Sequence, residues 1–323
     1  MAERSGEIAV GVVGLGYFGS HHARHYASHS GARLVAVVDA DPERACGTAE
    51  KYGAEAHAHH SALIGKVDAA SIAVPTSHHY AVACDLIDAG IHLFIEKPIA
   101  ADVADAAELV ERAGRRGAIV QVGHIERFSP AFRALEAEVR APRLIECVRR
   151  TPWTGRAADV DVVLDLMIHD IDLALTLAGA PLVSVAATGV SVVTGRNDVA
   201  EARLAFANGV VATLATSRVA SVGERLLSVT EPGRRLIADL ATPGLTIITG
   251  AADAVRTESV ALAHADNLLT EIDAFLGSVR TGTPPLVDGS AGLDALGAAA
   301  MILTSISEAR QVVPPSSQRS SRA

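Results

Sequence analysis

The sequence predicts an α/β protein in which a doubly wound parallel sheet comes first and an α+β domain with a mostly antiparallel sheet follows. Short apolar runs alternate with helical patterns in the first half, which is typical of parallel strands covered by helices on both faces. Beyond about residue 124 this alternation stops, and strand-like runs follow one another directly. The 323 residues, of which 49% are hydrophobic, are enough to bury a core in each of two domains.

The first half contains five strand-like runs with helices between them. The runs are 8–13, 33–38, 69–74, 92–95 and 118–122. Residues typical of helix ends mark the helices. Asp41-Pro42 begins one helix, Ser77 is expected to cap another that stops before Gly90, and Asp102 begins a third that ends near Gly114.

The second half combines four helical patterns with a series of strands. A helix of about ten residues begins at Ser129-Pro130, and apolar residues at 3.6 spacing predict a helix over 162–177. The strand-like runs are 144–151, 183–193, 200–207, 210–219, 236–240 and 245–248. Asn208-Gly209 predicts a tight hairpin, and Glu231-Pro232-Gly233 predicts a turn. Two helices, about 264–280 and 290–310, close the chain.

A dinucleotide-binding motif joins the first strand to the first helix. Gly14, Gly16 and Gly19 form a GxGxxG, with Tyr17 and Phe18 between the last two glycines, and Asp39 ends the second strand. The glycines admit the pyrophosphate to the helix N-terminus, and the acid accepts the ribose hydroxyls. This context predicts a Rossmann domain. Asp39 would repel a 2′-phosphate and no arginine follows directly in Ala40-Asp41-Pro42, so NAD is favoured over NADP.

Composition excludes several other classes of protein. The 28 Lys and Arg residues against 37 Asp and Glu residues give a formal net charge of −9, so a nucleic-acid partner is not expected. No uninterrupted apolar run approaches the ~18 residues of a membrane span, so we expect no membrane-spanning segment. The three cysteines have no paired spacing, which favours a reducing compartment. We therefore expect a cytoplasmic protein.

Three motifs give the chain a family resemblance. Glu96-Lys97-Pro98, Val74-Pro75-Thr76-Ser77-His78-His79 and Asp165-Leu166-Met167-Ile168-His169 resemble those of the glucose-fructose oxidoreductase and inositol 2-dehydrogenase family, Gfo/Idh/MocA, over nearly the whole chain to about Val313. The resemblance implies that Lys97 lies beside the nicotinamide, that Asp165 and His169 face a sugar, and that Pro75, Thr76, His79 and Glu96 contact the cofactor. With the change of pattern near residue 124, we expect an NAD-binding domain over 1–123 and a sugar-binding and oligomerisation domain over 124–313. The low-complexity segment 314–323 predicts a disordered tail.

The segment from Val122 to Pro130 suggests a subgroup. With Leu166 to Asp172 and Ser217-Arg218-Val219, it resembles the members that oxidise the 3-hydroxyl of UDP-N-acetylglucosamine on the way to the 3-amino sugars of lipid A or O-antigen. We expect His124, Arg127, Phe128, Arg156 and His169 to bind the substrate. Many family members carry Asn where this chain has Ile125-Glu126, and this departure affects the sugar contacts.

The proposed chemistry also follows from the residue types. Removal of a hydride from a carbinol requires a base for the hydroxyl proton, and Lys97 suits that role. An unperturbed lysine pKa of ~10.4 lies ~3 units above neutrality, a gap of ~4 kcal/mol that partial burial and the nicotinamide cation can largely supply. Asp165 and His169 are four residues apart, so a helix would place both on one face.

Arginines and histidines supply further candidates. Arg127, Arg149, Arg156 and Arg218 are candidates for the diphosphate, and Arg127 and Arg156 are favoured because they lie in predicted loops. His21, His25 and His29, with His22, have metal-ligand spacing, but no carboxylate or thiolate completes a set. We interpret them as structural and expect no metal. His57, His59 and His60 are interpreted as a solvated loop.

Three functions stay open on the sequence alone. The first is NAD-dependent oxidation of a nucleotide sugar, with UDP-N-acetylglucosamine favoured. The second keeps the chemistry but uses a free polyol or sugar such as inositol. The third is a regulatory protein that senses NAD without turnover. The apolar residues of 183–219 need a cover, so a homodimer or homotetramer is expected.

Overall fold

The computed structural model describes residues 6–251 and 254–312, so the expected tail over 314–323 lies outside the described residues. Apart from the segments not described, the chain divides into two compact units. Unit 1 comprises Met1–Arg133 and Ala263–Leu296, and unit 2 comprises Ala134–Leu262 and Gly297–Ala323. The chain therefore returns to the first unit after the second, whereas the sequence predicted a single boundary near residue 123.

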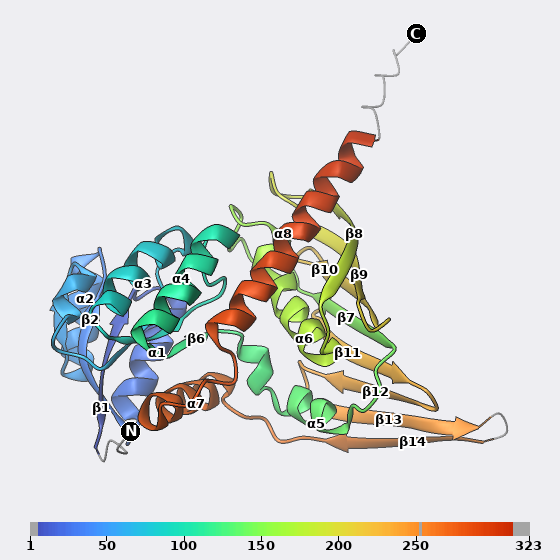
Figure 1. Cartoon of the computed structure of the whole chain (residues 1–323), viewed down its shortest axis with the longest axis horizontal. Helices are drawn as coiled ribbons and strands as arrows, with labels where there is room; N and C mark the ends of the chain where they lie inside the picture. Colours follow the sequence, from blue (N-terminus) through green and yellow to red (C-terminus); the bar gives the residue numbers. More distant parts are fainter. Residues whose placement is uncertain (1–5, 252–253, 313–323) are drawn as a thin grey trace, which may run out of the picture. The chain divides into compact units, whose positions relative to one another are not determined.

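Unit 1 is built on the parallel sheet that the sequence predicted. Its strand order is β3-β2-β1-β4-β5-β6, and every neighbouring pair is parallel (Figure 1). The strands are β1 (Ile8–Val13), β2 (Ala32–Val38), β3 (Glu55–His57), β4 (Ala69–Ile72), β5 (His92–Ile95) and β6 (Val120–Val122). Strand β3 was not predicted because its three residues, Glu-Ala-His, contain no apolar run.

Helices α1 (Tyr17–Ser28), α2 (Pro42–Tyr52), α3 (His79–Asp88) and α4 (Val103–Arg116) follow the strands. Asp41 and Asp102 cap α2 and α4 as predicted, each accepting backbone N–H bonds in the first turn. Ser77 does not cap α3. It lies inside the 3₁₀ turn η2 (Thr76–His78), whose tighter winding delays the α-helix until His79.

Two C-terminal helices, α7 (Asn267–Thr281) and α8 (Gly289–Val312), contribute to unit 1. Ile272 and Phe275 of α7 share one buried cluster with Tyr26 and Phe94. At the start of α8, a Cβ on Gly292 would lie 2.6 Å from Val122, so the helix can pack this closely on β6 only with glycine there. Burial of these apolar faces explains why a helix that begins 145 residues after the end of β6 belongs to the first core.

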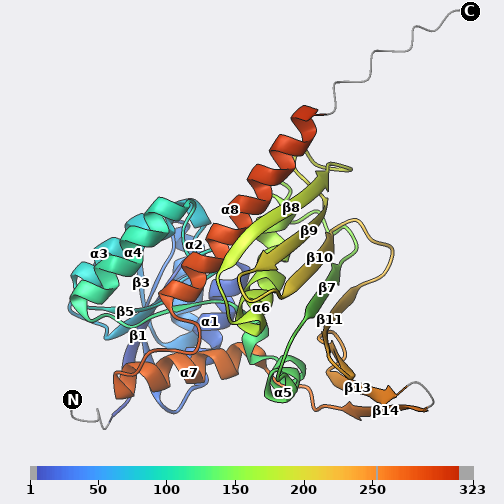
Figure 2. The same cartoon turned by 45° about the vertical axis from the view of Figure 1, so that its right-hand side comes forward.

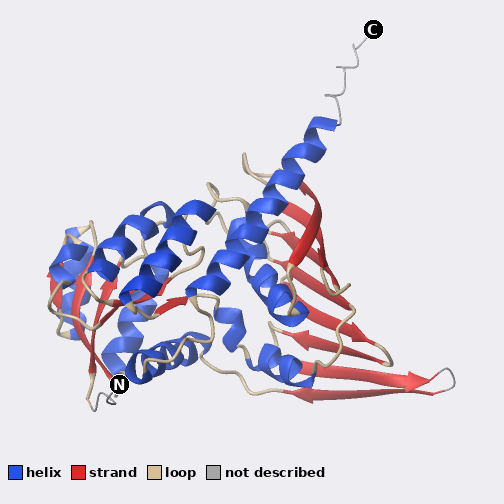
Figure 3. Cartoon of the chain, viewed as in Figure 1, coloured by secondary structure: helices blue, strands red, loops and turns tan. Residues whose placement is uncertain are grey.

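Unit 2 contains an eight-stranded sheet of order β14-β13-β12-β11-β7-β10-β9-β8, antiparallel except where β7 pairs with β10 (Figures 2 and 3). Its strands are β7 (Leu144–Arg150), β8 (Leu182–Val190), β9 (Val199–Phe206), β10 (Val211–Ser217), β11 (Glu224–Glu231), β12 (Arg234–Asp239), β13 (Gly244–Ala251) and β14 (Ala254–Ala261). The Asn208-Gly209 hairpin between β9 and β10 is confirmed. Strands β11 and β14 were missed, and the residues of β14 are all exposed, so it carries no burial pattern.

The helix predicted over 162–177 is not regular. Residues Val163–Met167 form a π-helical turn, and α6 (Ile168–Ala178) continues from it and packs on β7 and β10. The short helix α5 (Pro130–Glu138) agrees with the prediction. Single π turns inside helices occur frequently at functional sites.

Within the described residues, the segment Gly289–Arg310 of α8 is long and apolar enough to cross a membrane by length and composition. Ala299, Ile302 and Ile306 of this helix are buried in the protein. The core helix of a globular protein passes the same test, so this segment is weak evidence for a membrane span.

Candidate active site

A cavity of about 680 Å³ in unit 1 opens at the carboxyl ends of β1, β2 and β4. The strand order reverses between β1 and β4, which is where ligands bind in sheets of this kind. Its lining includes Gly14, Gly16, Asp39, Val74 and Pro75. Four of the predicted nucleotide-contact positions, Gly14, Gly16, Asp39 and Pro75, therefore line one cavity.

The three glycines of the GxGxxG differ in what surrounds them. Gly14 has a φ of +87°, and a Cβ there would lie 2.7 Å from the backbone of Ala73. A Cβ on Gly19 would lie 1.7 Å from the Gly14 carbonyl oxygen. A Cβ on Gly16 would meet nothing within 4 Å, so this glycine leaves open space at the N-terminus of α1. That open space in front of the helix dipole fits the pyrophosphate of NAD.

Tyr17 and Phe18 begin α1 and expose 59% and 40% of their surface. Their rings meet edge to face, with centroids 5.2 Å apart. Both rings are therefore accessible at the helix N-terminus, where the sequence predicted cofactor contacts.

Asp39 is buried, follows the last residue of β2 and lines the cavity. Its carboxylate accepts N–H bonds from Leu15 at 2.7 Å and Asp41 at 2.9 Å. The Arg44 guanidinium donates to both of its oxygens at 3.3 Å. Arg44 was not predicted at this position because it lies five residues after Asp39 rather than directly after it. Arg44 is the third residue of α2, and the first turn of that helix brings it back to the strand end.

We expect Asp39→Ser to weaken NAD binding by ~1–3 kcal/mol and to narrow the preference for NAD over NADP. The substitution removes the carboxylate that accepts ribose hydroxyls and repels a 2′-phosphate, and it leaves the adjacent Arg44 guanidinium available to phosphate. Titration of both cofactors against the parent and variant measures the two Kd values. Asp41→Ser is the matched control, since Asp41 caps α2 through its own side chain. Equal affinity of the unmutated protein for both cofactors would contradict the assignment.

The turn after β5 carries Glu96, Lys97 and Pro98. The Glu96 backbone N–H donates to the Ile72 carbonyl at 3.0 Å, and the Lys97–Pro98 peptide bond is cis. Lys97 is half-buried just after the carboxyl end of β5. The proposed base is therefore placed by the backbone of the sheet.

His79 links this turn to the one after β4. Its ring nitrogens lie 2.9 Å from the Pro98 carbonyl and 2.9 Å from the Val74 carbonyl. Burial lowers the pKa of the His79 imidazole, although both carbonyls act in the opposite direction. The side chain is buried, so His79 fastens the Pro75-Thr76 turn to the Lys97-Pro98 turn rather than lining the cavity.

The predicted substrate segment follows β6 as a 3₁₀ turn, η3 (Ile125–Phe128), rather than as the open loop expected for Arg127. His124 is buried, and burial followed by the nearby charges of Lys97 and Arg127 lowers its pKa to about 3. It is therefore neutral near pH 7. The Arg127 guanidinium lies over the Phe132 ring and donates to the Leu286 carbonyl at 3.3 Å. Phe128 is buried, so both side chains take part in the packing of unit 1.

In unit 2, Asp165 lies in the π turn and His169 is the second residue of α6. Both side chains are half-buried. The backbone N–H of Asp165 donates to the Asp161 carbonyl at 3.0 Å, and the Asp161 carboxylate accepts from the Val163 N–H at 3.0 Å. The two predicted sugar contacts thus span a π-to-α junction that Asp161 begins.

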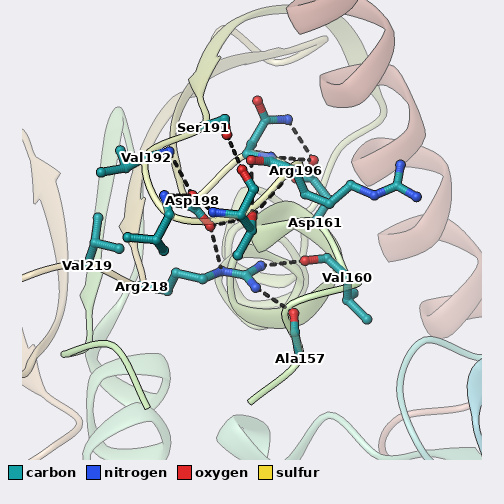
Figure 4. A network of polar contacts seen from close by, with 12 residues as sticks. Ala157, Val160, Asp161, Ser191, Val192, Arg196, Asp198, Arg218 and Val219 are labelled. Carbon is teal, nitrogen blue, oxygen red and sulfur yellow. Dashed lines mark hydrogen bonds and ion pairs between the residues drawn. The ribbon is translucent and has the colours of Figure 1, made fainter. Parts of the chain in front are cut away.

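Arg218 belongs to a buried polar network (Figure 4). Its guanidinium donates to the carbonyls of Ala157 at 2.6 Å and Val160 at 2.7 Å, and it lies 3.8 Å from Asp198. Burial alone would raise the pKa of the Asp198 carboxyl, but hydrogen bonds from Thr194 and the neighbouring backbone lower it instead. Arg218 therefore holds the segment before the π turn and is not placed as a phosphate ligand, which corrects its candidacy.

Arg149 is likewise committed to a structural ion pair. Its guanidinium donates to the Asp170 carboxylate from Nε at 3.1 and 3.0 Å and from Nη2 at 2.8 Å. Both side chains are almost fully buried. Of the four arginines considered for the diphosphate, Arg156 is the exposed one.

Three of the four histidines in and just after α1 have structural partners, as interpreted from the sequence. His25 lies 3.4 Å from Asp266, His29 lies 2.5 Å from Asp273, and His22 bonds Glu96. In the part of the chain that the structure describes, no group of three or more His, Cys, Asp or Glu residues is arranged to hold a metal ion.

The solvated-loop interpretation of the next histidines holds for His59, which is exposed between two elements, and is wrong for His57 and His60. His57 lies in strand β3, where it pairs with Glu55, and His59 caps the 3₁₀ turn η1 (His60–Leu63). His59 and His60 line the cavity.

Comparison with known proteins gives matches over both units. A family model described as "Oxidoreductase family, NAD-binding Rossmann fold" matches residues 8–124, and one described as "GFO/IDH/MocA C-terminal domain" matches residues 131–235. A UDP-N-acetylglucosamine 3-dehydrogenase from Acidithiobacillus ferrooxidans is 39% identical over 93% of this chain and 97% of its own. A solved structure of that enzyme superposes with a TM-score of 0.89, covering 94% of this chain and 98% of the other. An inositol 2-dehydrogenase from Rhizobium meliloti is 29% identical over 94% of this chain and 98% of its own.

Proposed function

The chain belongs to the GFO/IDH/MocA oxidoreductase family, and on that premise we propose that it oxidises the 3-hydroxyl of UDP-N-acetylglucosamine with NAD to give the 3-keto sugar. The observation that carries this proposal is the 39% identity, over nearly the full length of both chains, to a relative named for that reaction. The glycine cradle and the buried Asp39 support NAD as the cofactor.

Different residues have separate roles in the proposed reaction. Bound at the cavity of unit 1, NAD supplies the carbon that accepts the hydride. Lys97 takes the proton from the hydroxyl oxygen as the hydride leaves the sugar carbon that bears this hydroxyl. Asp165 and His169 bind the sugar, with His169 donating to or sharing the proton of the reacting hydroxyl. His124, neutral through burial, adds no positive charge beside Lys97.

The diphosphate requires cationic side chains. Arg156 is exposed in the segment before the π turn. In the same segment, Arg218 donates hydrogen bonds to the carbonyls of Ala157 and Val160, which follow Arg156. We propose Arg156 as a phosphate ligand, because a guanidinium matches phosphate oxygens in pairs. Arg127 remains a second candidate, although its guanidinium also packs on Phe132.

The cellular setting is part of the same proposal. A 3-keto sugar is the substrate that an aminotransferase needs to make a 3-amino sugar, so we propose a place in lipid A or O-antigen synthesis, in the cytoplasm. Val183 and Val190 of β8 expose 63% and 55% of their surface. This apolar strand supports a homodimer or homotetramer in which a second copy covers the sheet.

An inositol-type free substrate is the second candidate, favoured by the match to inositol 2-dehydrogenase. The discriminating experiment measures NADH formation from UDP-N-acetylglucosamine, N-acetylglucosamine and myo-inositol, together with the thermal shift that each ligand gives. We expect turnover and thermal protection with the UDP-sugar only, since protection follows ligand affinity by mass action. Comparable thermal shifts from N-acetylglucosamine and its UDP form would favour a free-sugar enzyme. Absence of NADH with every sugar would favour an NAD-sensing regulatory protein.

A further inference from the structure

A chain of buried polar groups crosses the core of unit 1 and ends on Glu96, the neighbour of the proposed base. The Tyr26 hydroxyl lies 2.8 Å from Ser71 Oγ, and Ser71 Oγ lies 3.0 Å from His22 Nδ1. His22 Nε2 lies 3.0 Å from Glu96 Oε1. Tyr26, Ser71 and His22 are completely buried, and the Glu96 side chain is 12% exposed. Helix α1 supplies the tyrosine and histidine one turn apart, and β4 supplies the serine.

Burying this series of polar groups among apolar side chains costs free energy. Tyr26 belongs to the apolar cluster of unit 1, and the His22 ring packs edge-on against Phe94 with centroids 4.6 Å apart. Ser71 is the only polar residue of β4. Polar groups in such surroundings destabilise a protein unless each is hydrogen-bonded, so a complete chain of partners stabilises one arrangement strongly over others.

One direction of donation satisfies every group along this series. With His22 Nε2–H donating to the Glu96 carboxylate, Nδ1 accepts from the Ser71 hydroxyl, and Ser71 Oγ accepts from the Tyr26 hydroxyl. Burial raises the pKa of Tyr26, which keeps the donating proton on its hydroxyl. Each group donates one hydrogen bond to the next group, and the series ends on the Glu96 carboxylate.

The other Glu96 oxygen is confined as well. A Cβ on Gly123 would lie 2.9 Å from Glu96 Oε2 and 3.2 Å from the Phe94 ring, so only glycine leaves room for the carboxylate. Glu96 is therefore held by His22 on one side and by the backbone of Gly123 on the other. Lys97 follows it directly in the same turn.

We propose that His22, oriented by Ser71 and Tyr26, is a positioning residue for the reaction: it fixes the Glu96 carboxylate and, through it, the turn that presents Lys97. The inference rests on the proposed function in taking Lys97 as the base. It predicts that damage to the chain lowers kcat and leaves NAD affinity nearly unchanged, because the glycine cradle and Asp39 lie in other loops.

Kinetics of four variants test the proposal. We expect His22→Leu to lower kcat by ~10- to 100-fold with KM for NAD within ~3-fold, and His22→Gln, which keeps an N–H donor, to recover most of the loss. Tyr26→Phe removes one hydroxyl from the folded core and is expected to lower kcat by a smaller factor, ~3- to 10-fold. Tyr52→Phe, a tyrosine of α2 outside the chain, is the matched control and should change nothing. Equal kcat in the parent, His22→Leu and Tyr26→Phe would overturn the proposal.

A double variant separates positioning from general damage. If His22 acts through Glu96, His22→Leu combined with Glu96→Gln should be no slower than the slower single variant. Multiplied losses would contradict the proposal.

An NMR measurement tests the chain without turnover. In ¹⁵N-histidine-labelled protein, with the His22 signals assigned by their absence from His22→Gln, we expect Nε2 to carry the proton and Nδ1 to be unprotonated. The Nδ1–H form would overturn the assigned direction. If the parent protein oxidises none of the sugars, the proposed function fails, and this spectrum alone decides the present inference.

Discussion

Replacement of Lys97 by alanine is expected to lower the turnover of sugar oxidation by ~10²- to 10⁴-fold, the usual worth of a positioned general base. The lysine follows the carboxyl end of β5, near the neutral His124, whereas Gly14, Gly16 and Asp39 of the nucleotide cradle follow β1 and β2. NAD affinity should therefore change little. The initial rate of NADH formation at saturating NAD and sugar gives kcat for the parent and the variant.

Lys66→Ala is the matched control for this prediction, since Lys66 is a surface lysine of the same unit that pairs with Glu55. It should retain the activity of the parent. His169→Ala should cost less than Lys97→Ala if His169 only orients the hydroxyl, and comparably if it shares the proton. A folded, NAD-binding Lys97→Ala protein that keeps most of its activity would remove the lysine from the mechanism and leave His169 as the base.

Breaking the Arg149–Asp170 ion pair should cost ~3–5 kcal/mol of unfolding free energy, because either single substitution leaves an uncompensated charge in the core of unit 2. The pair has almost no exposure, and three N–O contacts join its members. Urea unfolding of Arg149→Met measures the change against the parent protein.

The next residue along β7 provides the matched control. Arg150 pairs with Glu224, but the two side chains are 49% and 35% exposed. Arg150→Met should change stability by only ~0–1 kcal/mol, as is usual for exposed pairs. The double variant Arg149→Met/Asp170→Leu should recover part of the loss, since it removes both charges. Equal effects of Arg149→Met and Arg150→Met would show that burial of the first pair does not matter.

Local signals in the sequence were sufficient for the parts of the fold in which one segment decides its own structure. The buried strands β1 and β5 follow from continuous apolar runs, and Asp41 and Asp102 cap their helices as predicted. Strand β14 could not be found in this way. All its residues are exposed, so only its pairing with β13 makes it a strand. The same holds for the membership of α7 in unit 1, which depends on contacts with residues far away in the sequence.

The candidate site shows the same division. Gly14, Gly16, Gly19 and Asp39 belong to one motif whose chemistry is local, and the structure brings Gly14, Gly16 and Asp39 together at one cavity. An arginine carries no local sign of whether its partner is a ligand or a buried carboxylate. Arg149 and Arg218 were therefore open candidates in the sequence, and only the distant Asp170 and the carbonyls of Ala157 and Val160 assign them.

The central claim is that a hydride passes from the sugar C3 to NAD while Lys97 takes the hydroxyl proton. The direct measurement uses UDP-N-acetylglucosamine that carries deuterium at C3 only, with the mass of the reduced cofactor determined after one turnover. We predict that the reduced cofactor gains one deuterium and that the sugar product loses it. Unlabelled NADH, or deuterium retained in an oxidised sugar, would contradict oxidation at C3.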